Sequence, residues 1–214
     1  MKPDEALLKA KEVILAGGIV IVPTETFYGI AANPFDEAAV LRIFEIKSRR
    51  HAKPLPLIAS DLQAIRKLSP EPSPVARKLM DRFWPGSLTI LMRTEIILSE
   101  LLAGKAGKVG VRIPPDCPAR SLAGMVGGLI TATSANLSGD PNPSTVRMIS
   151  PKVIDSVDFV VDMGATPGGK PSTVMDIDGE EIKILREGAI STEQIRTFML
   201  QVNRLDTIVP SHYD

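Results

Sequence analysis

The stretch 19-IVIVPTETFYGIAANP-34 begins with four β-branched apolar residues and then becomes polar. The first four predict a buried strand over 19 to 22, because Val and Ile favour the packed surface of a sheet. Gly29 and the alanines after it keep side-chain bulk out of the space beside this segment. Turn geometry alone also favours Thr and Gly, so the stretch by itself leaves both a plain turn and a binding loop open. Hydroxyl groups follow the strand at Thr24, Thr26 and Tyr28.

Composition indicates an ordinary globular protein. The chain has 214 residues, of which 44% are hydrophobic and 23% charged, enough for a sizeable core. Its 25 basic and 25 acidic residues cancel, so any anion site must be a local cluster of cations. The longest apolar runs, such as 128-GLITATSA-135, are shorter than the roughly 20 residues that span a bilayer. No membrane segment is therefore predicted.

The N-terminus and the cysteine content indicate the compartment. The first residues lack the uninterrupted apolar stretch of a signal peptide. The single cysteine, Cys117, cannot form an intrachain disulfide, and with two histidines it gives no metal-ligand spacing. We therefore expect a cytoplasmic protein without a protein-held metal. Cys117 has no identifiable base partner, so it is not expected to be a nucleophile.

Periodicity predicts more strands than helices. Asp4 is expected to cap a helix that ends before Gly17, and Asp36 to cap a helix over 36 to 48. Further helices are expected over 61 to 68, 74 to 83 and 191 to 202. Further strands are expected over 55 to 59, 87 to 93, 109 to 113, 129 to 133, 158 to 162, 173 to 177 and 182 to 186.

The irregular spacing of these strands argues against an all-parallel sheet with repeating strand-helix units. We expect an α/β fold of the α+β type, with a mixed twisted β-sheet and flanking helices around a concave basic cleft. One domain over residues 1–190 is expected, followed by a C-terminal helix and tail over 191–214 that pack on it or trail from it.

Polar clusters occur at several predicted strand and helix ends. In 47-KSRRHAKPL-55 four cations lie within seven residues. One explanation of the cluster is structural, because the dipole of the preceding helix favours cations at its C-terminus. The other is an anion site, because the clustered cations repel one another unless an anion lies among them. Two more clusters, 131-TATSANLSGDPNPS-144 and 168-GGKPSTVMD-176, carry small hydroxyl and amide groups that can hold phosphate oxygens or simply form turns.

Absent motifs narrow the chemistry. The sequence has no Walker-type phosphate loop, no dinucleotide-binding glycine pattern and no Gly-x-Ser-x-Gly elbow. A site of Lys, Arg, Ser, Thr and Asn suits chemistry in which charge on phosphates and carboxylates is stabilised. This composition indicates phosphoryl or nucleotidyl transfer.

Seven motifs occur in order along the chain, namely PTETFYG at 23–29, KSR at 47–49 with KPL at 53–55, FWPGSLT at 83–89, VGVRIP at 109–114, SANLSG at 134–139, STVMD at 172–176 and ILREG at 184–188. Together they closely resemble the YrdC-domain family, the threonylcarbamoyl-AMP synthases. Two positions differ from the family pattern: Arg50 stands where proline commonly follows Lys-x-Arg, and Cys117 stands where His-Pro commonly begins. The resemblance implies a YrdC/RibB-like fold in the single-domain form.

The resemblance also implies an activity. The family makes threonylcarbamoyl-AMP and pyrophosphate from L-threonine, bicarbonate and ATP, and a downstream tRNA threonylcarbamoyltransferase uses the product to modify tRNA. Lys47 and Arg49 are the expected catalytic residues. Thr24, Thr26, Tyr28, Lys53 and Arg112 are expected to bind threonine and bicarbonate, and Ser134, Asn136, Ser172 and Arg186 to bind the nucleotide.

Magnesium is expected on the triphosphate of ATP, with no dedicated protein site. The alternative function is an RNA-binding module that uses the same basic cleft without small-molecule catalysis. Zero net charge and only nine aromatic residues disfavour it, although a weak tRNA contact is allowed. The sequence leaves the oligomeric state and the existence of a mobile lid over 47 to 56 undecided.

Overall fold

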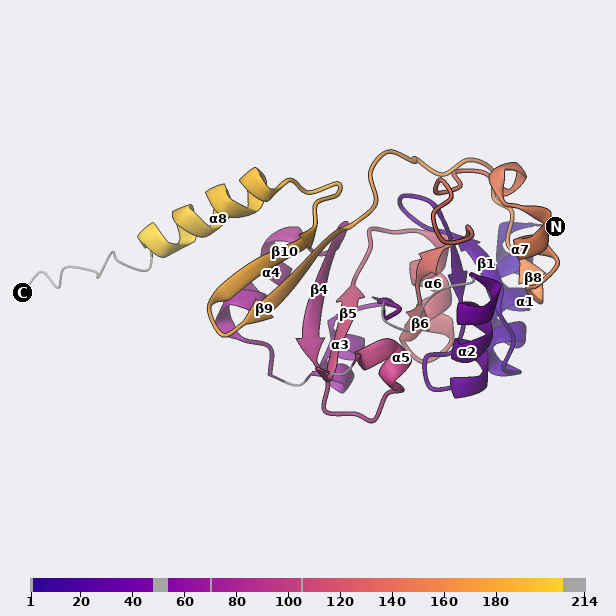
Figure 1. The fold of residues 1–214 in the computed structure, drawn as a ribbon, viewed down its shortest axis with the longest axis horizontal. Helices are drawn as coiled ribbons and strands as arrows, with labels where there is room; N and C mark the ends of the chain where they lie inside the picture. The colour runs from indigo at the N-terminus through magenta and orange to yellow at the C-terminus, as the bar shows by residue number, and fades with distance from the viewer. Residues whose placement is uncertain (1, 48–53, 70, 105, 206–214) are drawn as a thin grey trace, which may run out of the picture.

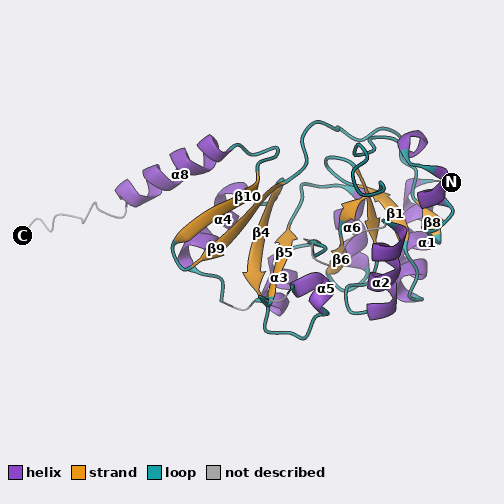
Figure 2. Ribbon diagram, in the orientation of Figure 1, coloured by secondary structure: helices purple, strands orange, loops and turns teal. Residues whose placement is uncertain are grey.

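The strands form two mixed sheets (Figure 2). The computed structural model describes residues 2–47, 54–69, 71–104 and 106–205. The smaller sheet has the order β7-β2-β1-β8 and the larger has the order β10-β9-β4-β5-β3-β6. The strands are β1 (Val20–Pro23), β2 (Tyr28–Ala31), β3 (Leu57–Ala59), β4 (Leu88–Arg93), β5 (Lys108–Arg112), β6 (Leu129–Thr131), β7 (Thr133–Ser134), β8 (Phe159–Val160), β9 (Thr173–Asp178) and β10 (Glu181–Arg186).

Helices flank both sheets (Figure 1). The predicted α+β architecture with a mixed sheet and flanking helices is therefore confirmed, with two sheets in place of one. The helices are α1 (Pro3–Leu15), α2 (Glu37–Ile46), α3 (Leu62–Leu68), α4 (Pro74–Phe83), α5 (Glu100–Ala103), α6 (Pro118–Met125), α7 (Pro151–Ile154) and α8 (Thr192–Leu205), with a 3₁₀ turn at Val146–Met148.

Strand β1 is buried on both faces, which explains the uninterrupted apolar run at its start. Ile19, just before it, and Ile21 face a large core that also contains α2, α3 and α4. Val20 and Val22 face a smaller core between the smaller sheet, α1 and α6. Side chains of a strand alternate between its two faces, so a strand between two cores needs apolar residues at every position.

The segment 129–134 joins the two sheets. The sequence predicts one strand over 129 to 133, whereas the structure divides it at Ala132. Before this residue, β6 pairs antiparallel with β3 in the larger sheet. After it, β7 pairs antiparallel with β2 in the smaller sheet. The prediction therefore located the strand but missed its passage from one sheet to the other.

Strand β2 was not predicted, because the polar turn before it masked a short buried strand. It pairs with β1 on one side and with β7 on the other. A Cβ at Gly29 would lie 3.2 Å from the backbone oxygen of Thr133. Glycine at this position therefore permits the close approach of β2 and β7 that brings the end of β7 beside the 24–27 turn.

The long helices were predicted well. Asp36 caps α2 by accepting a hydrogen bond from the Ala39 N–H at 3.0 Å, as expected. Asp61 caps α3 in the same way. The cap predicted at Asp4 is wrong, since α1 begins at Pro3 and Asp4 lies in its first turn. The short helices α5 and α7 were missed because one turn shows no periodicity, and α6 was missed because it has only eight residues and contains Gly124.

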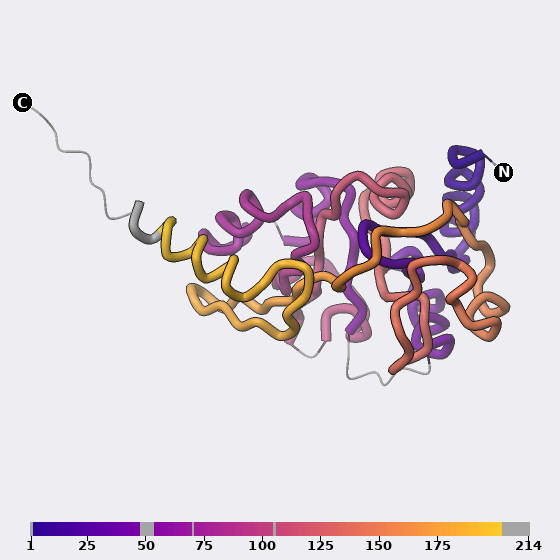
Figure 3. The backbone as a smooth tube through the Cα atoms, turned by 90° about the horizontal axis from the view of Figure 1, so that it is seen from above, coloured from indigo at the N-terminus to yellow at the C-terminus, as the bar shows by residue number. Residues whose placement is uncertain are grey.

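The first half of α8 packs on the body of the protein, although the helix extends away from the other elements (Figures 1 and 3). Ile195 belongs to the large core and is 3% exposed. The Phe198 ring meets the Phe83 ring of α4 edge to face, with centroids 5.6 Å apart. The helix predicted over 191 to 202 is therefore confirmed, while the division into residues 1–190 and 191–214 stays a prediction.

Within the described ranges, no helix combines the length and the apolar character that crossing a membrane requires.

Candidate functional site

A pocket of about 520 Å³ lies where the turn of the smaller sheet meets the larger sheet. Elements of both sheets contribute to it, namely the β1–β2 turn, β7, β4, β5, β9 and β10. The lining residues are Thr24, Thr26, Phe27, Tyr28, Gly29, Pro54, Pro56, Thr89, Leu91, Lys108, Gly110, Arg112, Ala132, Thr133, Ser134, Asn142, Pro171, Ser172, Val174, Leu185 and Arg186.

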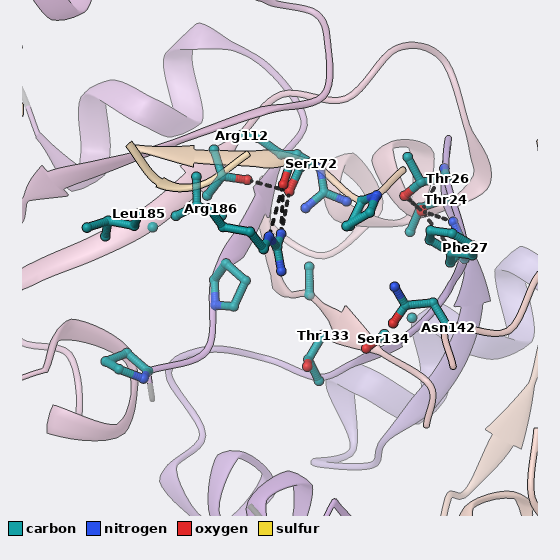
Figure 4. A pocket seen from close by; sticks show the side chains of 18 of the residues that line it. Thr24, Thr26, Phe27, Arg112, Thr133, Ser134, Asn142, Ser172, Leu185 and Arg186 are labelled. Atoms are coloured by element: carbon teal, nitrogen blue, oxygen red, sulfur yellow. Dashed lines mark hydrogen bonds between the residues drawn. The ribbon is translucent and has the colours of Figure 1, made fainter. Parts of the chain in front are cut away.

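The two ends of the pocket differ in chemistry (Figure 4). Thr24, Thr26 and Phe27 lie at one end and Leu185 lies at the other. Ser172, Arg112 and Arg186 lie between these ends. The pocket therefore offers the hydroxyl groups of Thr24 and Thr26 at one end, with guanidinium groups between them and Leu185.

Thr24 organises the turn at the hydroxyl end. Its Oγ1 donates to the Phe27 carbonyl at 2.7 Å and accepts from the N–H groups of Thr26 and Phe27, each at 3.2 Å. The Thr26 Oγ1 lies 3.3 Å from the Thr24 Oγ1. Such side-chain bonds to nearby backbone hold a turn in one conformation. Both hydroxyls therefore occupy fixed positions at the wall of the pocket.

Tyr28 lines the pocket, but its hydroxyl is engaged elsewhere. The phenol donates to the Gly164 carbonyl at 2.6 Å and accepts from the Met163 N–H at 3.2 Å. Burial raises the pKa of this phenol, and the nearby Asp162 carboxylate also raises it. The hydroxyl therefore fastens β2 to the loop after β8.

Two arginines face the middle of the pocket. Arg112, at the end of β5, pairs with Glu25 through its Nε at 3.0 Å and its Nη2 at 3.4 Å. Arg186, at the end of β10, donates from Nη2 to the Ser172 carbonyl at 2.8 Å and to the Ser172 hydroxyl at 3.3 Å. Burial lowers the pKa of Arg186, and the positive charge of Arg112 lowers it further.

Lys47 and Asn136 form a buried network with Ser134 and are not among the residues that line the pocket. The Lys47 Nζ donates to the Ser134 carbonyl, to the Asn136 carbonyl at 2.7 Å and to Asn136 Oδ1 at 3.0 Å. The Asn136 amide in turn donates to the Asp140 carbonyl. This network supports the loop after β7, which presents Ser134 to the pocket.

The structure brings together most of the described residues that were expected in the site. Arg49 and Lys53 lie outside the described residues, as do Arg50 and most of the segment 47 to 56. The basic character expected of the whole cleft also stays a prediction. Residues that line the pocket as expected are Thr24, Thr26, Tyr28, Arg112, Ser134, Ser172 and Arg186.

Sequence reasoning missed several polar residues of this region. Lys108 lines the pocket and pairs with Asp176 at 2.6 Å. The alternation of a strand offered a signal for it, since Lys108, Gly110 and Arg112 share one face of β5. Glu25 was not predicted, because its partner Arg112 is distant in the sequence. The described residues contain no group of three or more His, Cys, Asp or Glu side chains that could hold a metal ion.

Cys117 is buried at the start of α6, and burial raises the pKa of its thiol. A raised pKa lowers the thiolate fraction, which suits a packing role, and the expectation that Cys117 is not a nucleophile stays a prediction.

These features define an α+β protein with a polar pocket between two sheets, suited to a small ligand that carries both hydroxyl and anionic groups. A family model described as "Telomere recombination", for the Sua5, YciO and YrdC proteins, matches residues 12–188. The chain belongs to this family.

Two curated relatives illustrate the similarity. A putative threonylcarbamoyl-AMP synthase of Methanocaldococcus jannaschii is 37% identical over 185 residues, which cover 86% of each chain. A threonylcarbamoyl-AMP synthase of Pyrococcus abyssi is 35% identical over 182 residues, which cover 85% of this chain but 54% of that protein. The chain thus spans most of the first relative and about half of the second.

Solved structures agree with this assignment. Sua5 of Pyrococcus abyssi complexed with L-threonine superposes with a TM-score of 0.86 at 32% identity, covering 93% of this chain and 58% of that chain. YciO of Escherichia coli superposes with a TM-score of 0.74 at 26% identity, covering 88% of this chain and 91% of that chain.

Proposed function

We propose that this protein is a threonylcarbamoyl-AMP synthase, which forms threonylcarbamoyl-AMP and pyrophosphate from L-threonine, bicarbonate and ATP. The observation that carries the proposal is the order of groups along the pocket, with threonine hydroxyls at one end and two arginines in the middle. Relatives at 32–37% identity that are named threonylcarbamoyl-AMP synthases support the same function.

In the proposed reaction, the threonine amine and bicarbonate first give a carbamate and water. An oxygen of the carbamate then attacks the α-phosphorus of ATP, and pyrophosphate leaves with the electrons of the broken P–O bond. Both reactants are anions, so cations must offset their repulsion at short range. A carbamate readily loses carbon dioxide in water, so a partly enclosed pocket also protects it.

We assign the residues by the chemistry of each part of the pocket. Thr24 and Thr26 hold the threonine substrate at the hydroxyl end, and the Tyr28 ring borders them. Arg112 holds anionic oxygens at the centre, while Ser134, Ser172 and Arg186 hold the nucleotide. Lys47 and Asn136 support the nucleotide side of the pocket through their hydrogen bonds with Ser134. Arg49 and Lys53 keep their proposed roles as a catalytic cation and a substrate-binding cation.

The remaining partners belong to the same proposal. Magnesium enters with ATP, whose phosphates supply oxygen ligands. A downstream tRNA threonylcarbamoyltransferase consumes the product, and tRNA contact by this chain is weak. Because the adenylate serves tRNA, we place the protein in the cytoplasm. The RNA-binding alternative is less well supported, since the curated relatives are named as synthases.

The test is amino-acid-dependent release of pyrophosphate by the pure protein with ATP, magnesium and bicarbonate, without RNA. L-Threonine is expected to give faster release than L-valine, because valine has no hydroxyl to pair with that of Thr26, whereas the Thr24 hydroxyl is already bonded within the turn. Equal rates with the two amino acids would contradict the assignment of Thr24 and Thr26. Tight tRNA binding at physiological salt without pyrophosphate release would favour the RNA-binding alternative.

A further inference from the structure

Glu25 is a buried carboxylate beside the pocket, and the proposed reaction gives it no role. Its side chain is 8% exposed, and the Arg112 side chain with which it pairs is 7% exposed. It also accepts a hydrogen bond from the Ser87 hydroxyl at 3.2 Å. Burying a carboxylate costs free energy unless cations and hydrogen bonds compensate its charge. Arg112 and Ser87 provide this compensation for Glu25.

The pair connects the two sheets across the pocket. Glu25 lies in the turn between β1 and β2 of the smaller sheet. Arg112 ends β5 of the larger sheet, and Ser87 immediately precedes β4 of the same sheet. The carboxylate therefore joins the turn that carries Thr24 and Thr26 to the sheet that carries the arginines.

The two arginines differ in how their charges are compensated. Arg112 has a full negative charge beside it. Arg186 has neutral partners, namely the carbonyl and hydroxyl of Ser172, and the Ser172 hydroxyl accepts a further hydrogen bond from Thr89 at 3.0 Å. The two guanidinium groups are close enough for the charge of Arg112 to lower the pKa of Arg186. One carboxylate thus offsets part of a concentrated positive charge.

We propose that Glu25 is a built-in counter-anion, which holds Arg112 in place and lowers the affinity of the pocket for the phosphate groups of its ligands. The inference rests on the proposed function, because it concerns release of the pyrophosphate that this reaction makes. In the ligand-free protein Glu25 reduces the repulsion between the arginines. In the complex it repels the bound phosphates and so speeds their departure.

Glu25→Gln keeps the shape of the side chain and removes its charge. The variant is expected to bind inorganic pyrophosphate about tenfold more tightly, since one nearby negative charge is gone. Release of pyrophosphate then slows, so kcat and the KM for ATP are both expected to fall. A residue that only shaped the turn would lower affinity and activity without lowering KM.

The experiment measures pyrophosphate affinity by calorimetry and melting temperature with and without pyrophosphate, for the wild type and for Glu25→Gln. Glu12→Gln is the control, since it makes the same change in net charge at an exposed position of α1. The ligand-free Glu25→Gln protein is expected to melt lower than the wild type, and pyrophosphate is expected to raise its melting temperature by more. Glu12→Gln is expected to match the wild type in both measurements.

Unchanged or weaker pyrophosphate binding by Glu25→Gln would overturn the inference. If this variant does not fold alone, added pyrophosphate must restore a cooperative melting transition, because the ligand then supplies the missing negative charge. Failure of that rescue would also overturn it. If the wild type neither binds pyrophosphate nor makes the adenylate, the proposed function itself fails. If the wild type does both and Glu25→Gln binds pyrophosphate no more tightly, only the inference about Glu25 fails.

Discussion

At the scale of single residues, several polar groups of the site also hold its walls together. Lys47 is 3% exposed and donates to the Ser134 carbonyl at the end of β7 and to two oxygens of Asn136 in the loop after it. The sequence placed it in a cluster of cations that repel one another, whereas the structure places its ammonium among carbonyl and amide oxygens. Removing it therefore affects the fold as well as the chemistry.

Lys47→Met is expected to lower turnover by about a hundredfold, because Ser134 and the loop after β7 lose the hydrogen bonds that position them beside the pocket. It is also expected to destabilise the protein by about 1 to 3 kcal/mol, because buried oxygens lose their donor. Steady-state assays and thermal melts measure the two effects. Lys152→Met, at an exposed position of α7, is the control. Wild-type turnover in the Lys47 variant would contradict the proposed support of Ser134 by Lys47.

Tyr28→Phe separates anchoring from substrate recognition. The change removes the hydroxyl that joins β2 to Gly164 and Met163. Stability is expected to fall by about 1 kcal/mol, while the KM for threonine changes by less than about threefold. Chemical denaturation and initial-rate kinetics give the two values. A large rise in KM with unchanged stability would instead assign the hydroxyl to the substrate.

At the scale of elements, the sequence predicted the helices and strands that a local residue pattern determines, and it missed features that depend on pairing with distant segments. The helices α2, α3 and α4 begin at caps whose side chains were visible in the sequence. Strand β2 was missed because its length and its glycine suit a turn, and only its neighbours β1 and β7 make it a strand. The division at Ala132 was missed because the segment pairs with a different sheet on each side of this residue, and no local sequence pattern indicates such a change.

The same distinction holds for the site. Its hydroxyls and arginines could be predicted because resemblance to a known family singled them out. Glu25 was missed because its role depends on Arg112, which lies 87 residues away in the chain. The burial of Lys47 was likewise invisible, since its oxygen partners are on the loop after β7.

Asp158 joins α2 to the start of β1 and gives a pH-dependent test at this scale. Burial alone would raise the pKa of this carboxyl, but hydrogen bonds from Arg42 and the Ile19 N–H, with the Arg42 charge, together lower it. A lowered folded-state pKa contributes stability that is present above the unfolded value of about 3.9 and is lost as the pH falls through the folded value.

Asp158→Asn is therefore expected to melt below the wild type at neutral pH. The difference is expected to shrink as the pH falls below the unfolded value of about 3.9 and through the lower folded-state pKa, where the wild-type carboxyl gains its proton. Melting curves across this range give the measurement. A difference that stays constant with pH would show that the charge of Asp158 adds nothing to stability.

At the scale of the whole molecule, the pocket exists because two sheets share the segment 129–134 and meet at the Glu25–Arg112 pair. The final helix, α8, belongs to the large core through Ile195. Among the described residues, the buried Ile195 side chain and the Phe198 ring of α8 both pack against the body of the protein.

Ile195→Ala tests how α8 is coupled to the rest of the protein. The variant is expected to lose about 2 to 4 kcal/mol of stability, as usual when a large buried side chain is truncated. Calorimetry should show one transition at a lower temperature, with the pocket lost at the same point. Two separate transitions would instead mean that the helix and the domain before it unfold independently.

The most direct measurement is mass spectrometry of the product made from ATP, magnesium, L-threonine and ¹³C-bicarbonate by the pure protein without RNA. The account predicts threonylcarbamoyl-AMP with a single ¹³C atom, formed only when all three substrates are present and accompanied by equimolar pyrophosphate. Absence of this adenylate from a folded protein that binds ATP and threonine would contradict the proposed function.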